Sequence, residues 1–118
     1  HTIAVVTTLR PSAAVALAVR FNPGVTVLVL TKAEHRKRVE RLGATWADID
    51  AHAAAVHSWE ATYRQSVPGN PQYWRFCHTR WLTLAAELRA HPPPQDAAVA
   101  VMDDDVLLFE PVSRRLRE

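Results

Sequence analysis

The sequence predicts an α/β domain in which helices cover both faces of a mostly parallel β-sheet. Two apolar, β-branched runs at 2–8 and 25–30 lack helical periodicity, as expected of strands that are buried on both faces. A third apolar run at 97–102 follows a long helical pattern. Because strands that alternate with helices form parallel sheets with right-handed crossovers, we expect a Rossmann-like three-layer sandwich.

The first part of the chain alternates strand and helix patterns in the order strand 2–8, helix 13–20, strand 25–30 and helix 31–43. Asn22, Pro23 and Gly24 end the first helix. Thr31 and Glu34 stand three residues apart, a capping-box pattern that predicts where the second helix begins. Each strand is therefore followed by a crossover helix.

The second part predicts a short edge strand at 45–50, a mostly helical stretch to residue 65, a loop at 67–71 and a helix at 74–90. The apolar face of this last helix is expected to hold six residues at helical spacing, namely Trp74, Cys77, Trp81, Leu84, Ala85 and Leu88. The triple proline at 92–94 ends the helix, and 114–118 is predicted to be a charged tail.

Length and composition predict a single domain over 1–118. The chain has 118 residues, of which 48% are hydrophobic and 22% charged, and this suffices for one core. A formal net charge of +2 is too small to indicate a nucleic-acid partner. No apolar run approaches the roughly 20 residues that span a bilayer, so we expect membrane association only through an N-terminal anchor upstream of His1.

Three consecutive carboxylates, Asp103, Asp104 and Asp105, follow the last predicted strand. Adjacent anions repel one another where a buried strand limits their hydration, and a cation relieves this cost. Carboxylate oxygens suit Mg²⁺ or Mn²⁺, which need only one or two protein ligands when phosphate oxygens and water complete the shell. The sequence therefore predicts a metal-diphosphate site, with a solvated acidic turn as the alternative interpretation.

The end of the first strand supplies further candidate residues. In open parallel sheets, ligands bind beyond the carboxyl ends of the strands, where the strand order reverses. Thr7, Thr8 and Leu9 stand at that end of the first strand, so one crevice contains them and the aspartates if the two strands are neighbours. The chain has three glycines and no glycine-rich phosphate loop. A metal would therefore have to neutralise the charge of a bound diphosphate.

Four segments together resemble glycosyltransferases of the GT-A fold: 3–9, 25–31, 74–81 and the D-x-D string within 101–109. The resemblance implies that Asp105 coordinates Mn²⁺ or Mg²⁺ and that Asp103 holds the donor ribose or shares the metal. Asp104 would be the variable middle position of the motif, beside the donor. Two further donor contacts are implied, with the nucleobase and ribose at Thr7 to Leu9 and with the donor phosphates or sugar at Arg80.

The activity that the resemblance implies is metal-dependent transfer of a sugar from a UDP- or GDP-sugar to an acceptor hydroxyl. The catalytic base and the acceptor site would lie in a C-terminal half that follows the motif. We therefore expect the chain to be the donor-binding portion and to transfer little or no sugar by itself. A Golgi location through an N-terminal anchor is expected of a eukaryotic member, and a cytoplasmic one of a bacterial member.

Three other classes of protein remain open. A haloacid dehalogenase-type phosphatase would use Asp103 as nucleophile and Asp105 as acid/base, although that motif favours Thr or Val where this chain has Leu107. A receiver domain of a signalling protein has a similar acidic strand end, but its phospho-accepting Asp and its Lys lie well downstream. A non-catalytic interaction domain is the third alternative.

Overall fold

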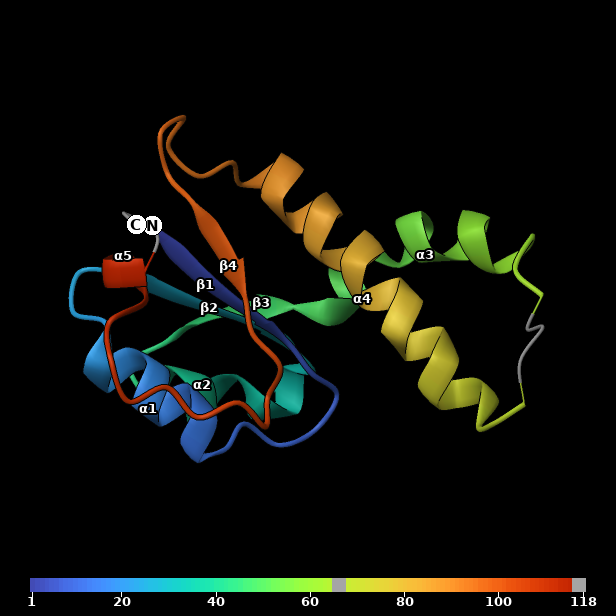
Figure 1. Ribbon diagram of the computed structural model, residues 1–118. Coiled ribbons are helices and arrows are strands. Elements are labelled where there is room, and N and C mark those ends of the chain that lie inside the picture. Colours follow the sequence, from blue (N-terminus) through green and yellow to red (C-terminus); the bar gives the residue numbers. More distant parts are fainter. Residues whose placement is uncertain (65–67, 116–118) are drawn as a thin grey trace.

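The computed structural model describes residues 1–64 and 68–115 and has an α/β fold. Its four strands are β1 (Thr2–Val6), β2 (Thr26–Thr31), β3 (Thr45–Asp48) and β4 (Val99–Val101). All neighbouring strands pair in parallel, in the order β3-β2-β1-β4 (Figure 1). The prediction of an α/β domain with a parallel sheet is confirmed, and the segment at 45–48 is an edge strand as expected.

Strand β1 is an inner strand of the sheet and pairs with a neighbour on each side. Thr2 aligns with Thr26 of β2 on one side and with Val99 of β4 on the other. Ile3, Ala4 and Val5 are at most 1% exposed, because both faces of the strand are covered as well as both edges. This burial explains why the strand appears in the sequence as an uninterrupted apolar run rather than an alternating one.

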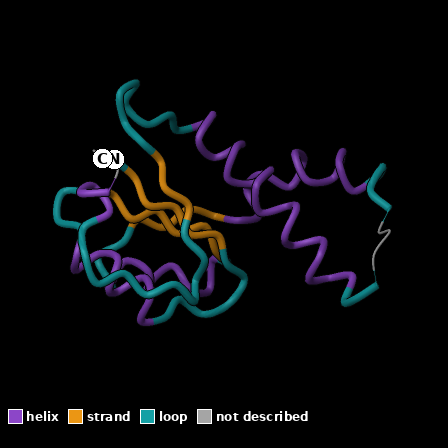
Figure 2. Tube along the Cα trace, viewed as in Figure 1, coloured by secondary structure: helices purple, strands orange, loops and turns teal. Residues whose placement is uncertain are grey.

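Helices α1 (Ala13–Phe21) and α2 (Arg36–Arg41) cover one face of the sheet. The side chain of Ser12 caps α1 by accepting a hydrogen bond from the backbone N–H of Ala14. The core on this face joins β1 and β2 to the two helices through Ile3, Val5, Val27, Val29, Ala14, Val15, Ala18 and Val39. Figure 2 shows this helical layer on one side of the strands and α4 on the other.

Helix α4 (Pro71–Ala90) covers the opposite face, where Leu84 packs with Ala4, Val6 and Leu30. Helix α3 (Ala53–Glu60) packs on α4 and, with the amino-terminal part of α4, extends beyond the sheet (Figure 1). Two short 3₁₀ turns complete the connections, η1 at Ala33–His35 and η2 at Ile49–His52. The strands therefore lie between two helical layers, as predicted.

The capping-box prediction at Thr31 and Glu34 is wrong. Thr31 is still part of β2, where it aligns with Asp48 of β3, and it is fully buried. The 3₁₀ turn that follows has Lys32 at its N-cap and no side-chain cap. Pairing with the edge strand therefore extends β2 by one residue and outweighs the local capping preference of the sequence.

The predicted limits and apolar face of the long helix also need correction. Helix α4 begins at Pro71, inside the predicted loop, because Asn70 accepts a hydrogen bond from the N–H of Gln72 and proline suits the first turn. Trp81 was expected in the core but is 50% exposed, whereas Thr83 and Glu87 are buried. The buried face of α4 is thus rotated toward two polar positions. Residue 67 of the predicted loop lies outside the described residues.

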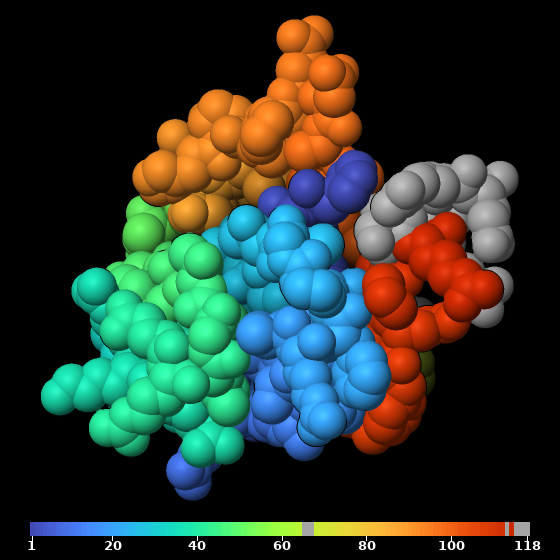
Figure 3. Space-filling view, turned by 90° about the vertical axis from the view of Figure 1, so that its left-hand side faces the viewer, coloured from blue at the N-terminus to red at the C-terminus, as the bar shows by residue number. Residues whose placement is uncertain are grey.

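After β4 the chain crosses back along the α1 face of the sheet. Leu108 and Val112 pack against the core there, and the Val112 N–H donates to Asn22 Oδ1 at 2.6 Å. Figure 3 shows this red segment beside the blue α1. The predicted charged tail begins within a short helix, α5 (Val112–Arg115), and its positions 116–118 lie outside the described residues.

Across the described ranges, 1–64 and 68–115, none of the helices has the length together with the apolarity needed to cross a bilayer.

Candidate functional site

The carboxyl ends of β1 and β4 lie side by side, because these two strands are neighbours in the sheet. From β1 the chain proceeds through α1 to β2 and β3 on one side, whereas β4 joins β1 on the other side. The strand order therefore reverses between β1 and β4, and a crevice at such a reversal is the usual place for a ligand in an open parallel sheet.

All seven residues that the sequence predicts for the site line one cavity at this reversal. The cavity has a volume of about 460 Å³. Its walls include the two strand ends and the amino-terminal half of α4, and the predicted lining residues are Thr7, Thr8, Leu9, Arg80, Asp103, Asp104 and Asp105. Asn70, Tyr73 and Cys77 also line it. We refer to it below as the aspartate cavity.

Asp104 is tied to the end of β1. Its Oδ2 accepts a hydrogen bond from the Thr7 hydroxyl at 2.5 Å, and its backbone carbonyl accepts one from Ser12 Oγ at 3.2 Å. The buried Thr7 oxygen in turn accepts from the Leu9 N–H at 3.0 Å. The middle aspartate, which the resemblance makes the variable position, is therefore the one that joins the two strand ends.

Asp103 and Asp105 have different surroundings. Asp103 Oδ1 accepts from Arg80 Nη1 at 2.6 Å, so the arginine is ion-paired with the acidic segment across 23 positions of sequence. Asp105 is exposed, and its carboxylate has no hydrogen-bond or ion-pair partner among residues 1–64 and 68–115. A bond from the Val106 N–H to the Asp103 carbonyl at 3.2 Å closes the turn between them.

The described part of the chain holds no group of three or more His, Cys, Asp or Glu side chains arranged to hold a metal. A hard divalent cation bound to a diphosphate needs fewer protein ligands, commonly one or two carboxylates. Asp103 and Asp105 supply these donors and both are exposed. The donor set therefore fits Mg²⁺ or Mn²⁺ with phosphate and water completing the shell.

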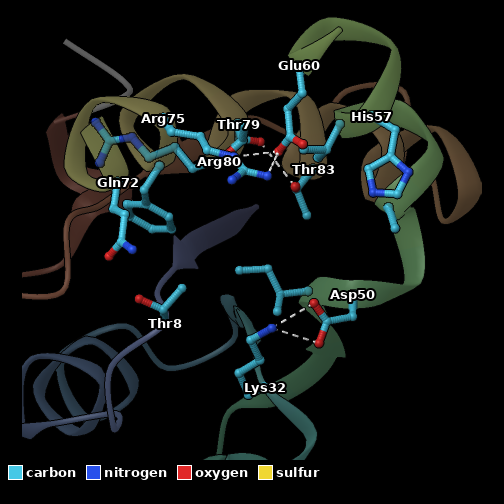
Figure 4. A pocket seen from close by; sticks show the side chains of 14 residues that line it. Thr8, Lys32, Asp50, His57, Glu60, Gln72, Arg75, Thr79, Arg80 and Thr83 are labelled. Carbon is cyan, nitrogen blue, oxygen red and sulfur yellow. Dashed lines mark hydrogen bonds and ion pairs between the residues drawn. The ribbon is translucent and has the colours of Figure 1, made fainter. Parts of the chain in front are cut away.

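A second cavity, of about 570 Å³, adjoins the aspartate cavity and shares Thr8, Gln72, Phe76 and Arg80 with it. Figure 4 shows two ion pairs on its opposite walls. Lys32, just after β2, pairs with Asp50 of η2 at 2.8 Å, and Arg75 of α4 pairs with Glu60 of α3. We call this space the ion-pair cavity.

The four residues that form these two ion pairs were not predicted as site residues from the sequence. Lys32 directly follows a strand, and the ends of parallel strands meet at one edge, so its position was a usable signal. Glu60 and Arg75 meet only because α3 folds back on α4. No local pattern indicates that contact.

Tyr73 lies at the mouth of the aspartate cavity and is 60% exposed. A hydrogen bond with the Cys77 thiol raises the pKa of Tyr73 above its ordinary value of 10.0, and the charge that Cys77 carries when ionised adds to this effect. Cys77, which was predicted on the apolar face of the helix, is half-buried and also lines the aspartate cavity.

Glu87 forms a third polar cluster on the other half of α4. Its Oε2 lies 2.6 Å from His52 Nε2, and its Oε1 lies 2.9 Å from His91 Nδ1. Glu87 and His91 line a cavity of about 590 Å³ together with Thr2 of β1, Thr26 of β2 and the whole of β3, which places the cluster beside β3 and the start of β1 and β2. It is therefore separate from the aspartate cavity.

Comparisons of the chain with protein-family models, curated proteins and solved structures found no match.

Proposed function

We propose that the aspartate cavity binds the metal-diphosphate of a UDP- or GDP-sugar, and that the chain is the donor-binding portion of a metal-dependent glycosyltransferase of the GT-A type. One observation carries the proposal. The seven residues chosen from the sequence converge on a single cavity at the strand-order reversal, although they come from three separate segments of the chain.

The aspartates would hold the cation. Among the residues that the structure describes, the Asp105 carboxylate has no partner, and Asp103 presents an exposed carboxylate whose current partner is the Arg80 cation. When bound, Mn²⁺ or Mg²⁺ would supply positive charge that offsets the charge building on the departing nucleoside diphosphate. Asp104 would act by positioning, because its bond to Thr7 fixes the acidic turn against β1.

The nucleoside would extend from the aspartate cavity over Thr8 into the ion-pair cavity. The two spaces share four lining residues, so a ligand can occupy both. The Lys32–Asp50 and Arg75–Glu60 pairs present donors and acceptors on opposite walls, suited to the polar edge of a base and to ribose hydroxyls (Figure 4). Arg80 lies between the two spaces and can reach the diphosphate from there.

Isothermal titration with UDP, GDP, UDP-glucose and GDP-mannose, each with and without Mn²⁺, tests the proposal. We expect binding that requires the cation and falls by at least about tenfold in Asp105→Ala. Asp96→Ala is the matched control, because Asp96 is an exposed aspartate before the other end of β4. An equal loss of nucleotide affinity in both variants would contradict the proposal. Nucleotide binding of the same strength with and without Mn²⁺ would contradict it as well.

A phosphatase assay on the same preparations separates the main alternative. Hydrolysis of a simple phosphate ester by the wild-type chain, lost in Asp103→Asn, would replace the transferase proposal with a phosphatase that uses Asp103 as nucleophile.

A further inference from the structure

Arg80 stands where three cavities meet. It lines the aspartate cavity, the ion-pair cavity and a third cavity of about 320 Å³ beside β4. Its side chain is 26% exposed, and the guanidinium carbon lies 5.2 Å from the centre of the Trp81 ring. A small rotation of this side chain would therefore move its charge from one cavity to the next.

The hydrogen bonding of Arg80 is incomplete in the observed arrangement. Nη1 donates to Asp103 Oδ1, but Nε is buried and has no partner among the described residues. A buried donor without a partner is uncommon and calls for an explanation. One explanation is that the side chain has a second arrangement in which this donor is used.

The ion pair with Asp103 conflicts with cation binding at the same carboxylate. The guanidinium occupies Oδ1 of Asp103, a group that the proposed function assigns to the metal. Two cations that share one carboxylate repel each other, and a divalent ion repels the guanidinium more strongly than a monovalent one would. Binding of a metal at this carboxylate therefore weakens the Arg80 pair and favours its displacement.

We propose that Arg80 is an exchange residue, a mobile positive charge that neutralises Asp103 in the absence of metal and moves onto the diphosphate when the metal binds. This inference rests on the proposed function. In this arrangement, Arg80 opposes binding of the metal alone and favours binding of the metal together with a diphosphate. Metal and nucleotide are then coupled through one side chain, and each strengthens the binding of the other.

Mn²⁺ binding by the folded 118-residue chain tests the first half of the proposal, with free Mn²⁺ measured by electron paramagnetic resonance. Arg80→Gln removes the competing charge and keeps a polar side chain of similar length. We expect it to bind Mn²⁺ alone about three- to tenfold more tightly than wild type, which is the size expected for loss of one partly exposed ion pair and its charge.

Arg75→Gln is the matched control. Arg75 is on the same helix and lines the ion-pair cavity with Arg80, but its partner is Glu60. If Arg80 acts by occupying Asp103, Arg75→Gln changes Mn²⁺ affinity by less than about twofold, since it removes the same net charge without freeing an aspartate. An equal increase of Mn²⁺ affinity in both variants would overturn the proposal, because the loss of one positive charge near the site would then explain the increase.

Coupling to the nucleotide tests the second half. In wild type, saturating UDP or GDP should tighten Mn²⁺ binding, and in Arg80→Gln this gain should shrink by at least about fivefold. Mn²⁺ binding by Arg80→Gln that is no tighter than wild type would overturn the inference and leave the proposed function standing. Absence of Mn²⁺ binding in wild type and both variants, with and without nucleotide, would overturn both.

Discussion

Two groups of carboxylates lie beside different parts of the sheet, and their surroundings differ. Glu87, beside β3 and the start of β1 and β2, has a side chain only 10% exposed, and both of its oxygens lie within hydrogen-bonding distance of histidine nitrogens. Asp103, Asp104 and Asp105, at the carboxyl ends, are more exposed, and only Asp103 and Asp104 have side-chain partners in the described part of the chain.

The difference separates a structural carboxylate from a binding one. A buried anion is tolerated only where hydrogen bonds replace its lost hydration, and Glu87 meets that condition by joining η2 to the end of α4. The aspartates keep unused lone pairs in a cavity, so they remain available to a ligand. The completeness of hydrogen bonding therefore distinguishes the two groups better than their charge does.

Removal of Glu87 should produce the largest loss of stability. Glu87→Ala deletes two hydrogen bonds between a carboxylate and histidine, and we expect the free energy of unfolding to fall by about 2–4 kcal/mol. Urea denaturation measures it. Glu34→Ala is the control, because the side chain of Glu34 is 73% exposed and should change stability by less than about 0.5 kcal/mol. Equal stability of the two variants would show that Glu87 is not a structural carboxylate.

The Thr7–Asp104 bond should have an intermediate effect. Thr7→Val and Asp104→Asn each remove or weaken a partly buried hydrogen bond between β1 and the acidic turn, at an expected cost of about 1 kcal/mol. A double-mutant cycle measured by urea denaturation should show that the two costs are not additive, because both changes affect one bond. Strict additivity would mean that the two side chains do not interact in solution.

Asp105 should have almost no effect on stability. Its carboxylate is exposed and unpartnered within the described ranges, so Asp105→Asn should change the free energy of unfolding by less than about 0.5 kcal/mol. The same variant should lose most Mn²⁺-dependent nucleotide binding. A large loss of stability in thermal or urea unfolding would show that Asp105 is a structural residue like Glu87.

The smallest expected effect concerns the pKa of Tyr73. Because the folded chain holds the phenol proton more tightly than the unfolded chain, this group's contribution to stability is present below pH 10 and is lost as pH rises through the raised pKa. Cys77→Ala removes the largest cause, so the pKa of Tyr73 should move back toward 10.0. Phenolate absorbance during an alkaline titration measures the change, and an unmoved titration would exclude the Cys77 contact.

Much of the fold could be predicted because the burial of a segment determines its local pattern of apolar residues. The runs at 2–6 and 26–31 are apolar throughout since their strands are covered on both faces. The errors occurred where a distant contact decided the outcome. Thr31 stayed in β2 because it pairs with β3, and Trp81 is exposed because α4 turns Thr83 and Glu87 toward the sheet instead. Helical spacing alone does not reveal that His52 and His91 bracket Glu87.

The candidate site divides in the same way. Sequence by itself determined which residues end the strands, because a change from apolar to acidic residues at 102–103 is a local property. Only the tertiary structure decided the partners. Thr7 meets Asp104 across 97 positions and Arg80 meets Asp103 across 23, through the placement of β4 next to β1 and of α4 over both. The physical reason is that the local pattern of apolar residues depends on how deeply a segment is buried. Strand order and helix rotation set the direction of each side chain, and both depend on the packing of the whole chain.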